Sequence, residues 1–438
     1  MGKGSMKLAV VAALVLMLIG SWYTMFKDGT AEHVEYENHI AVARDRADKK
    51  LYEEAYDSYK AALSMFDSIE LREEIADFCK NSGRTEDYVE FCAETARKYP
   101  HDPKSYVRMA EYYSEAENYF MFFSTLTKAE KRGIRSAELD ALEAAYKYAF
   151  QIKALGYRDV RVFSNGLCAV RRGADEWGFT DLNGKVQLGF NYTAAGDYTG
   201  YYIAVEHRSG GYALIDPTGR EKSKPAETLQ VEDCLFLFED KMAVKYGGKY
   251  HYCDMWFNEL FGSYDYAGTF SGGLAAVKEG DRWYVIDSSG NKVGEKSFEE
   301  IKVDEKGVAF RNGVAFAKEN GKYFLIDTSA NRVGNGEWAD VDCFNSNQPA
   351  AVSNGQKWGF IDTAGNVVLD YSYGQARSFS NGFAAVAEDG KWGYVIIEDY
   401  SLKIDYQFVD AKDFSASGTV YVSRGTGWDL LEIYSYNQ

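Results

Sequence analysis

The feature that most constrains the fold is a repeat of about 35 residues that begins near Tyr157 and continues to the end of the chain. Each copy has an aromatic residue, a turn, a strand of small residues, a polar turn, and a Trp or Tyr that opens a second strand. A unit this short cannot bury both of its faces alone, so neighbouring copies must stack on one another. The residues that open the copies are Phe163, Tyr198, Phe236, Phe270, Phe310, Phe344, Phe379 and Phe414.

The second strand of each copy supplies the predicted core of the repeats. In the segment from Trp358 to Asp362, side chains alternate between the two faces of a strand, so Trp358 and Phe360 share one face and Ile361 lies on the other. The large ring at the start of this strand recurs throughout the array. We therefore predict equivalent, largely buried core positions for Trp177, Trp283, Trp358 and Trp392.

The repeats resemble the WG-repeat family of bacterial proteins. The segments KWGFID from Lys357 and KWGYVI from Lys391 carry the resemblance most clearly, and the third copy, with KYHYCD around Tyr250, departs from it most. We assign residues 156–438 to this β-repeat domain of about eight copies. Eight copies favour a closed β-propeller whose first segment completes the last blade, because the final copy is incomplete. An open β-solenoid is the alternative, since 35 residues are few for four strands.

Residues 28–155 show a helical period instead. The segment from Leu51 to Asp67 resembles the second helix of a tetratricopeptide repeat, with Ala55, Tyr59 and Ala62 on one face. Similar turns recur 33 residues apart, near the tetratricopeptide period. The alignment places Cys79 and Cys92 on facing helices, where we expect both side chains to be buried and close together.

The tetratricopeptide resemblance also implies a binding groove. In that family the first helix of each repeat lines a concave surface that often holds a peptide. The aligned groove positions are Glu70, Glu73, Asp77, Tyr106 and Tyr113. An acidic stripe with two tyrosines suits a basic or extended peptide. A solvated helix face with no ligand is the alternative reading of the same residues.

The N-terminal residues 1–27 contain an uncharged stretch from Leu8 to Phe26, preceded by Lys3 and Lys7. Its 19 residues rise about 28 Å as a helix, close to the thickness of a bilayer core. This predicts a signal anchor, hence a single-pass cell-membrane protein whose remaining chain is extracytoplasmic by the positive-inside rule. A cleaved signal peptide is the alternative, although the residues after the stretch form a poor cleavage site.

Composition and motifs argue against several functions. The net charge of −17 disfavours nucleic-acid binding. The six cysteines form no CxxC pair, and the histidines show no metal-ligand spacing apart from a lone His33/His39 pair, so we expect no metal and no cofactor. An Asp that recurs four residues after the repeat aromatic stands where a strand meets a turn, which indicates backbone capping rather than catalysis. We expect no enzymatic activity.

Taken together, these features predict a multidomain protein: a transmembrane helix, a tetratricopeptide-like α-solenoid and an all-β repeat domain. The expected function is a membrane-anchored, non-catalytic interaction scaffold at the bacterial cell envelope, whose partner is an unidentified protein or peptide. The alternative is a carbohydrate-binding or glycan-active β-propeller that recognises a cell-envelope glycan. A catalytic site should break the repeat symmetry, and the only break found in the sequence is the third copy, around Cys253 to Trp256.

Overall fold

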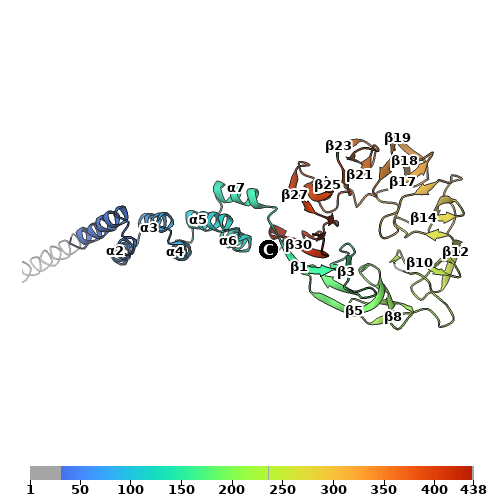
Figure 1. Cartoon of the computed structure of the whole chain (residues 1–438), viewed down its shortest axis with the longest axis horizontal. Helices are drawn as coiled ribbons and strands as arrows, with labels where there is room; N and C mark the ends of the chain where they lie inside the picture. The colour runs from blue at the N-terminus through green and yellow to red at the C-terminus, as the bar shows by residue number, and fades with distance from the viewer. Residues whose placement is uncertain (1–30, 235, 437–438) are drawn as a thin grey trace, which may run out of the picture. The chain divides into compact units, whose positions relative to one another are not determined.

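The structure, a computed structural model, describes residues 31–234 and 236–436 and divides into two compact units between Lys147 and Tyr148 (Figure 1). The first unit is helical and begins with a helix over residues 31–48. The helices that follow are α2 (Tyr52–Met65), α3 (Ile69–Asn81), α4 (Thr85–Lys98), α5 (Lys104–Glu115), α6 (Tyr119–Lys131) and α7 (Ala137–Tyr146).

Small buried residues let consecutive helices of this unit approach closely. Ala55 and Ala62 are fully buried, and Tyr59 between them is 3% exposed. Both thiols that the alignment placed in this core are buried and free, which confirms the predicted burial of Cys79 and Cys92. Burial raises the pKa of Cys79 to about 11 and that of Cys92 to about 12, so both thiols stay protonated at neutral pH.

The predicted membrane span over residues 8–26 lies outside the residues that the structure describes. Within the described ranges, no helix is long and apolar enough to cross a membrane. The labelled helices have 10 to 14 residues, whereas a span needs about 20. This finding contradicts the predicted transmembrane helix and the single-pass cell-membrane localisation.

The second unit is built from strands. The first half contains β1 (Phe150–Tyr157), β2 (Asp159–Val160), β3 (Leu167–Arg171), β4 (Trp177–Asp181), β5 (Val186–Ala195), β6 (Ile203–His207), β7 (Tyr212–Ile215), β8 (Glu221–Ser223), β9 (Leu237–Phe238), β10 (Lys241–Tyr246), β11 (Lys249–Cys253), β12 (Glu259–Tyr264), β13 (Tyr266–Ala267), β14 (Leu274–Glu279) and β15 (Arg282–Asp287). The second half contains β16 (Glu300–Ile301), β17 (Val314–Glu319), β18 (Lys322–Asp327), β19 (Arg332–Trp338), β20 (Asp340–Val341), β21 (Ala350–Ser353), β22 (Trp358–Ile361), β23 (Val367–Tyr373), β24 (Gln375–Ala376), β25 (Phe383–Glu388), β26 (Lys391–Ile396), β27 (Leu402–Phe408), β28 (Asp410–Ala411), β29 (Thr419–Ser423) and β30 (Trp428–Ile433), followed by the short 3-10 helix η1 (Tyr434–Tyr436).

In the described part of this unit, the strands make eight antiparallel blades arranged in a ring (Figure 1). Blades three to seven follow chain order: β9–β12, β13–β15, β16–β19, β20–β23 and β24–β27. Blades one and two share the long strand β5, which pairs with β4 through its first half and with β6 through its end. In the fourth blade, isolated bridges at Phe298 and Lys292 take the place of a fourth strand.

The ring is closed by the first strand of the unit. β1 pairs antiparallel with β30 and completes the eighth blade, which otherwise contains β28, β29 and β30. The first and last blades also share a core, because Tyr157 and Val170 pack with Tyr421 and Leu430. The β-repeat unit is therefore a closed propeller, and this pairing excludes the open solenoid.

Both faces of each blade are buried against neighbouring blades. In β22, Phe360 packs into a cluster that includes Phe379 of the next blade, whereas Ile361 packs into a cluster that includes Phe316 of the preceding blade. This arrangement follows from the alternation of side chains along a strand. It explains why a single repeat cannot fold by itself.

The glycine of the Trp-Gly pair is required by a bulge in the outer strand. Trp358 pairs with Tyr373 and Phe360 with Leu369, so the extra residues of β23 bulge opposite Gly359. A Cβ atom at Gly359 would lie 2.7 Å from the backbone oxygen of Leu369, and the equivalent atom at Gly178 would lie 2.8 Å from that of Leu188. Any side chain at these positions would collide with backbone.

Replacement of Gly359 with alanine is expected to lower the free energy of unfolding by about 1–3 kcal/mol, because the outer strand must move to admit the methyl group. Gly189→Ala is the matched control, since its added Cβ would meet nothing closer than the Asn191 amide nitrogen at 3.4 Å. Urea unfolding followed by circular dichroism measures both changes. Equal effects of the two substitutions would contradict the steric role of Gly359.

Candidate functional site

The three acidic residues predicted to line the helical groove lie along α3. Glu70 and Asp77 are exposed and Glu73 is half-buried. Two of these acidic residues form ion pairs with cations of α5. Lys104 Nζ lies 2.8 Å from Glu73 Oε2, and Arg108 Nη1 lies 2.7 Å from Asp77 Oδ1. The surface therefore carries both signs of charge, unlike the acidic stripe expected from the alignment.

The two tyrosines of the predicted groove are placed differently. Tyr106 is 2% exposed, and its hydroxyl accepts a hydrogen bond of 2.5 Å from Arg132 Nη1. Tyr113 is half-buried against the ring of Tyr112, and burial raises its pKa. Tyr106 is thus a core residue of the helical unit rather than a groove residue.

A cavity of about 420 Å³ does lie on the helical unit. Three alternate helices, α3, α5 and α7, supply all but two of its lining residues, and these are the first helices of successive pairs. Of the five predicted groove residues, Asp77 alone reaches it. The lining consists of Asp77, Lys80, Tyr88, Pro103, Lys104, Val107, Arg108, Glu111 and Glu138.

The four tryptophans predicted to form the repeat core occupy equivalent positions at the start of the third strand of their blades. Trp392 is buried, at 9% exposed, while Trp177, Trp283 and Trp358 are half-buried. Several of the residues that open the repeats are fully buried instead, among them Phe270, Phe344 and Phe379.

The recurring aspartates cap turns, as predicted. Asp362 Oδ1 accepts hydrogen bonds of 2.9 Å from the backbone nitrogens of Ala364 and Asn366. The same two-bond cap is made by Asp181, Asp216, Asp254, Asp287 and Asp327. These carboxylates have a structural role in six of the eight repeats.

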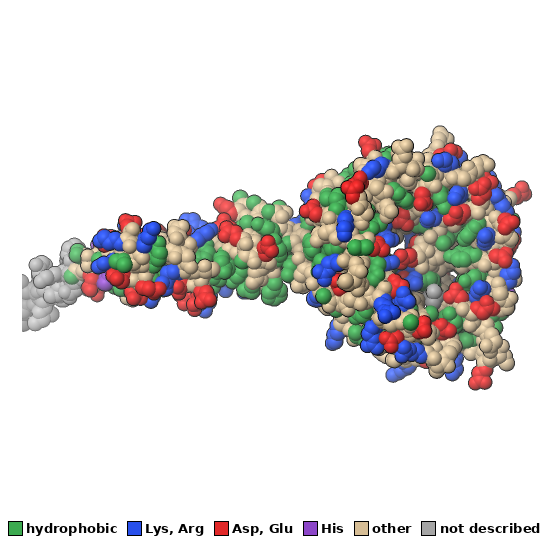
Figure 2. Space-filling view, viewed as in Figure 1, with side chains coloured by type: hydrophobic (Ala, Val, Ile, Leu, Met, Phe, Trp, Pro, Cys, Tyr) green, Lys and Arg blue, Asp and Glu red, His purple; other side chains and the backbone are tan. Residues whose placement is uncertain are grey.

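Charged side chains gather at the axis of the propeller instead. The short first strand of each blade lies innermost, and the residues that follow these strands meet around the ring opening. Acidic and basic side chains surround this opening (Figure 2). Arg161, Asp197, Asp342, Arg377 and Lys412 occupy such positions in blades one, two, six, seven and eight.

The fifth blade sends a loop across this opening. Nine positions separate Ile301 from Phe310, whereas three separate Val341 from Phe344 in the sixth blade. We call residues 302–309 the axial loop. Asp304 fixes its turn, because its Oδ1 accepts hydrogen bonds from the backbone nitrogens of Lys306 at 2.8 Å and Val308 at 2.9 Å.

The axial loop contacts five other blades through polar groups. Lys302 Nζ lies 3.6 Å from Asp340 Oδ1 in the sixth blade. Glu305 binds Lys412 of the eighth blade at 2.7 Å and, through its carbonyl oxygen, Arg161 of the first blade at 2.9 Å. Lys306 lies 3.4 Å from Asp197 Oδ2 in the second blade. Thr269 of the fourth blade donates its backbone N–H to Gly307 O at 2.8 Å. The loop thereby joins opposite sides of the ring.

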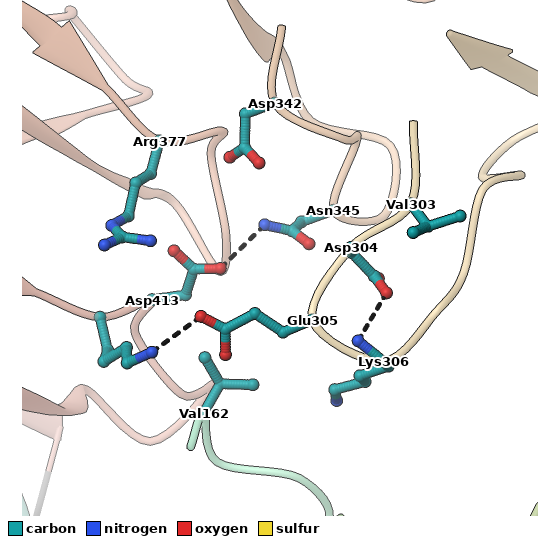
Figure 3. A pocket seen from close by; sticks show the side chains of 10 residues that line it. Val162, Val303, Asp304, Glu305, Lys306, Asp342, Asn345, Arg377 and Asp413 are labelled. Atoms are coloured by element: carbon teal, nitrogen blue, oxygen red, sulfur yellow. Dashed lines mark hydrogen bonds and ion pairs between the residues drawn. The ribbon is translucent and has the colours of Figure 1, made fainter. Parts of the chain in front are cut away.

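Beside the axial loop lies a cavity of about 170 Å³, which we call the axial cavity (Figure 3). Its side chains come from five blades, so residues far apart in the chain converge on it. The lining consists of Val162, Val303, Asp304, Glu305, Lys306, Asp342, Asn345, Arg377, Lys412 and Asp413.

Two carboxyl groups of the axial cavity have perturbed acidity. Burial, together with the neighbouring charge of Asp342, raises the pKa of Asp413 to about 7. Burial also raises the pKa of Asp342. Burial acts in the same direction on Glu305, but the cations of Lys412, Arg377 and Arg161 outweigh it, so the pKa of Glu305 lies below its usual range. Near neutral pH, the protonated and ionised forms of Asp413 are therefore both populated.

The repeat pattern did not reveal this site. The break in repeat symmetry found in the sequence lies at the third copy, but Asp254 makes the ordinary turn cap there. The real break is the axial loop of the fifth copy. Its signal in the sequence is the spacing of 40 residues from Phe270 to Phe310, where the other spacings run from 34 to 38.

Across the described residues, no group of three or more His, Cys, Asp and Glu side chains is arranged to hold a metal ion. The charged groups of the axial cavity can instead exchange protons and make ion pairs or hydrogen bonds with a small polar molecule.

Several solved structures are similar to this chain at low identity. Kluyveromyces lactis Hsv2p has a TM-score of 0.39 at 11% identity, over 57% of this chain and 97% of that one. The β-propeller domain of Myceliophteria thermophila Cps50 (Swd1) has a TM-score of 0.36 at 13% identity, over 65% and 98% of the two chains. Because each TM-score is below 0.5, the description of the fold rests on the strand pairing of this chain alone. No curated protein matches the chain.

The family described as "WG containing repeat" has a model that matches residues 263–283 and 358–392. The first segment runs from the end of β12 through β13 and β14 to the start of β15. The second runs from β22 through β23, β24 and β25 to the start of β26. The match does not extend to the helical unit, so the tetratricopeptide reading stays a prediction. The match therefore supports the presence of WG repeats in these two segments of the β unit.

Proposed function

We propose that this chain is a non-catalytic scaffold that binds a protein partner through an extended peptide segment held by the helical unit. WG repeats and a propeller suggest a repeat-based scaffold for protein interactions in general terms. The observation that carries the finer proposal is the cavity of about 420 Å³ on the first helices of successive pairs.

The chemistry of this groove indicates the kind of peptide. Val107 and Pro103 offer an apolar floor beside the ring of Tyr88. The cations Lys104 and Arg108 are paired with acidic residues of α3, so the groove has no large electrostatic potential of a single sign. The groove therefore suits an extended segment with an apolar side chain flanked by charges of both signs, held in the manner of other groove-bound peptides.

Val107→Glu is expected to weaken peptide binding at least about tenfold, because it places a carboxylate on the apolar floor. A random peptide library is selected on the full chain, and the affinity of an enriched peptide is measured by fluorescence anisotropy. Lys131→Glu, at an exposed position of α6 outside the groove, is the matched control and should bind as the unaltered chain does.

Two results would contradict the proposal. One is a selection that enriches no peptide. The other is an enriched peptide that binds the Val107→Glu and Lys131→Glu variants equally well, since its site would then lie elsewhere.

The glycan alternative receives no comparable support. Sugar-binding sites commonly stack aromatic rings on the faces of sugars, and the residues that line the axial cavity include no aromatic side chain. The scaffold is therefore the function that the geometry supports best.

A further inference from the structure

The ion pairs around the axial cavity leave two charges without a partner. Each cation that lines it has an acidic partner: Lys412 binds Glu305 at 2.7 Å, Lys306 binds Asp197 at 3.4 Å, and Arg377 binds Asp410 at 3.0 Å. Asp304 is likewise paired with Arg311 at 3.1 Å.

The unpaired groups are the carboxylates of Asp342 and Asp413. No Lys, Arg or His of the described chain lies within 4.0 Å of either one in an ion pair, although both have hydrogen-bond partners. Asn345 Nδ2 donates to Asp413 Oδ2 at 3.0 Å, and the backbone nitrogen of Ser378 donates to Asp342 Oδ2 at 2.8 Å. Both carboxyl groups extend toward the cavity in Figure 3.

We propose that the axial cavity binds a small primary ammonium ion through the carboxylates of Asp342 and Asp413 and the amide oxygen of Asn345. The nitrogen of Asn345 is already committed to Asp413, which leaves its oxygen as an acceptor. An ammonium group has three N–H donors, and these three side chains supply three acceptors. The volume of about 170 Å³ admits a molecule of a few heavy atoms beyond the ammonium group.

Other ligand classes fit less well. The described residues offer no metal-binding group of three or more acidic, His or Cys side chains. An anion would meet the carboxylates of Asp342 and Asp413, neither of which has an ion-pair partner, and each cation of the wall is already in an ion pair with another acid. A primary ammonium ion supplies the missing positive charge in a region where burial penalises lone carboxylates.

The proton is a competitor for the same site. Asp413 faces Asp342 and Glu305, which favour its protonation, and Arg377 and Lys412, which oppose it. With a pKa of about 7, its carboxyl group is mostly ionised at about pH 8.5 and mostly protonated at about pH 6. Ammonium binding should therefore strengthen as the pH rises through neutrality.

The test uses the full chain with n-propylammonium chloride as the probe and n-propanol as the uncharged counterpart. At about pH 8.5 propylammonium should raise the midpoint of thermal unfolding in a saturable manner, while propanol and an equal concentration of sodium chloride should not. The apparent dissociation constant should be about tenfold weaker at about pH 6, where the probe remains charged but Asp413 does not. This comparison uses the unaltered chain and so does not depend on any variant folding.

Variants locate the site. Asp413→Asn and Asp342→Asn keep the size of each side chain and remove its charge, and each should abolish the response to propylammonium. Asp370→Asn, at an exposed carboxylate of β23, is the control that should retain it. Equal responses to propylammonium and propanol, a response that does not change with pH, an equal response to calcium chloride, or full binding by Asp413→Asn would each overturn the proposal.

Discussion

Replacement of Phe379 with alanine should destabilise the propeller by about 4 kcal/mol, more than the loss of the tryptophan that gives the repeats their signature. Phe379 is fully buried between the sixth and seventh blades. Its ring lies 4.9 Å from that of Phe360 and 5.9 Å from that of Tyr400. Truncation of a fully buried Phe leaves a cavity that closely packed neighbours cannot fill, which costs about 3–5 kcal/mol in other proteins.

Trp358→Ala provides the comparison. Trp358 is only half-buried, because it stands at the start of β22 near the edge of its blade. We expect its replacement to cost about 1–2 kcal/mol, since much of the ring already contacts solvent. Urea unfolding of both variants, followed by the circular dichroism of the β unit, gives the two values. A larger loss for Trp358→Ala than for Phe379→Ala would show that the core lies at the tryptophans after all.

This order of importance shows what the repeat pattern could and could not reveal. The spacing of aromatic residues is sufficient to predict eight units that stack, because each unit carries its own hydrophobic pattern. The pattern does not reveal how deeply each side chain is buried. Trp358 and Phe360 share one face of a strand, but Phe360 stands in the middle of the strand and is fully buried. The size of the tryptophan side chain and its recurrence in the repeats favoured it as the core residue. The position of a residue along the strand is what decides how deeply it is buried.

The start of the β unit was difficult to place for a related reason. The sequence predicts a helical domain that continues to residue 155, whereas β1 begins at Phe150. The segment from Phe150 to Tyr157 has no repeat partner beside it in the chain, because its partner is β30 at the far end. Only the phase of the repeats indicated that the first segment belongs to the last blade.

The axial cavity lies beyond the reach of a repeat pattern. Arg161 and Glu305 are 144 residues apart in the chain, yet they share a hydrogen bond at the axis. Glu305 and Lys412 are 107 residues apart. Closing the ring brings such residues together, so their contacts depend on the number and angle of the blades. A search for residues of one chemical type at fixed spacing cannot find them.

The closing blade contains a carboxylate at the position where three other blades have the glycine of the Trp-Gly pair, namely Gly178, Gly359 and Gly393. Trp428 is followed by Asp429, which faces a bulge in β1. Asp429 Oδ1 accepts hydrogen bonds from the backbone nitrogens of Leu155 at 2.9 Å and Gly156 at 3.0 Å. Its Oδ2 accepts from Arg424 Nη2 at 2.7 Å. The side chain therefore satisfies two backbone groups that the bulge removes from the strand ladder.

Asp429→Ala is expected to lower the free energy of unfolding by about 3 kcal/mol at neutral pH, because two backbone N–H groups and one guanidinium lose their acceptor. Asp429→Asn keeps one oxygen acceptor and should cost less, about 1–2 kcal/mol. Asp405→Ala, at an exposed carboxylate of β27, is the matched control and should change stability by less than about 0.5 kcal/mol. Urea unfolding measures all three.

The effect of Asp429 must also depend on pH. Burial works to raise the pKa of Asp429, but Arg424 and the two backbone N–H groups outweigh it and hold the pKa below its usual value. The ionised form is thus favoured in the folded state, so its contribution is complete above the unfolded pKa of about 4 and is lost as the pH falls through the lower folded pKa. The stability gap between the unaltered chain and Asp429→Ala should therefore narrow below about pH 4. A gap that stays constant down to that acidity would mean that the charge contributes nothing, and that the pairing of β1 with β30 closes the ring by its backbone hydrogen bonds and shared core alone.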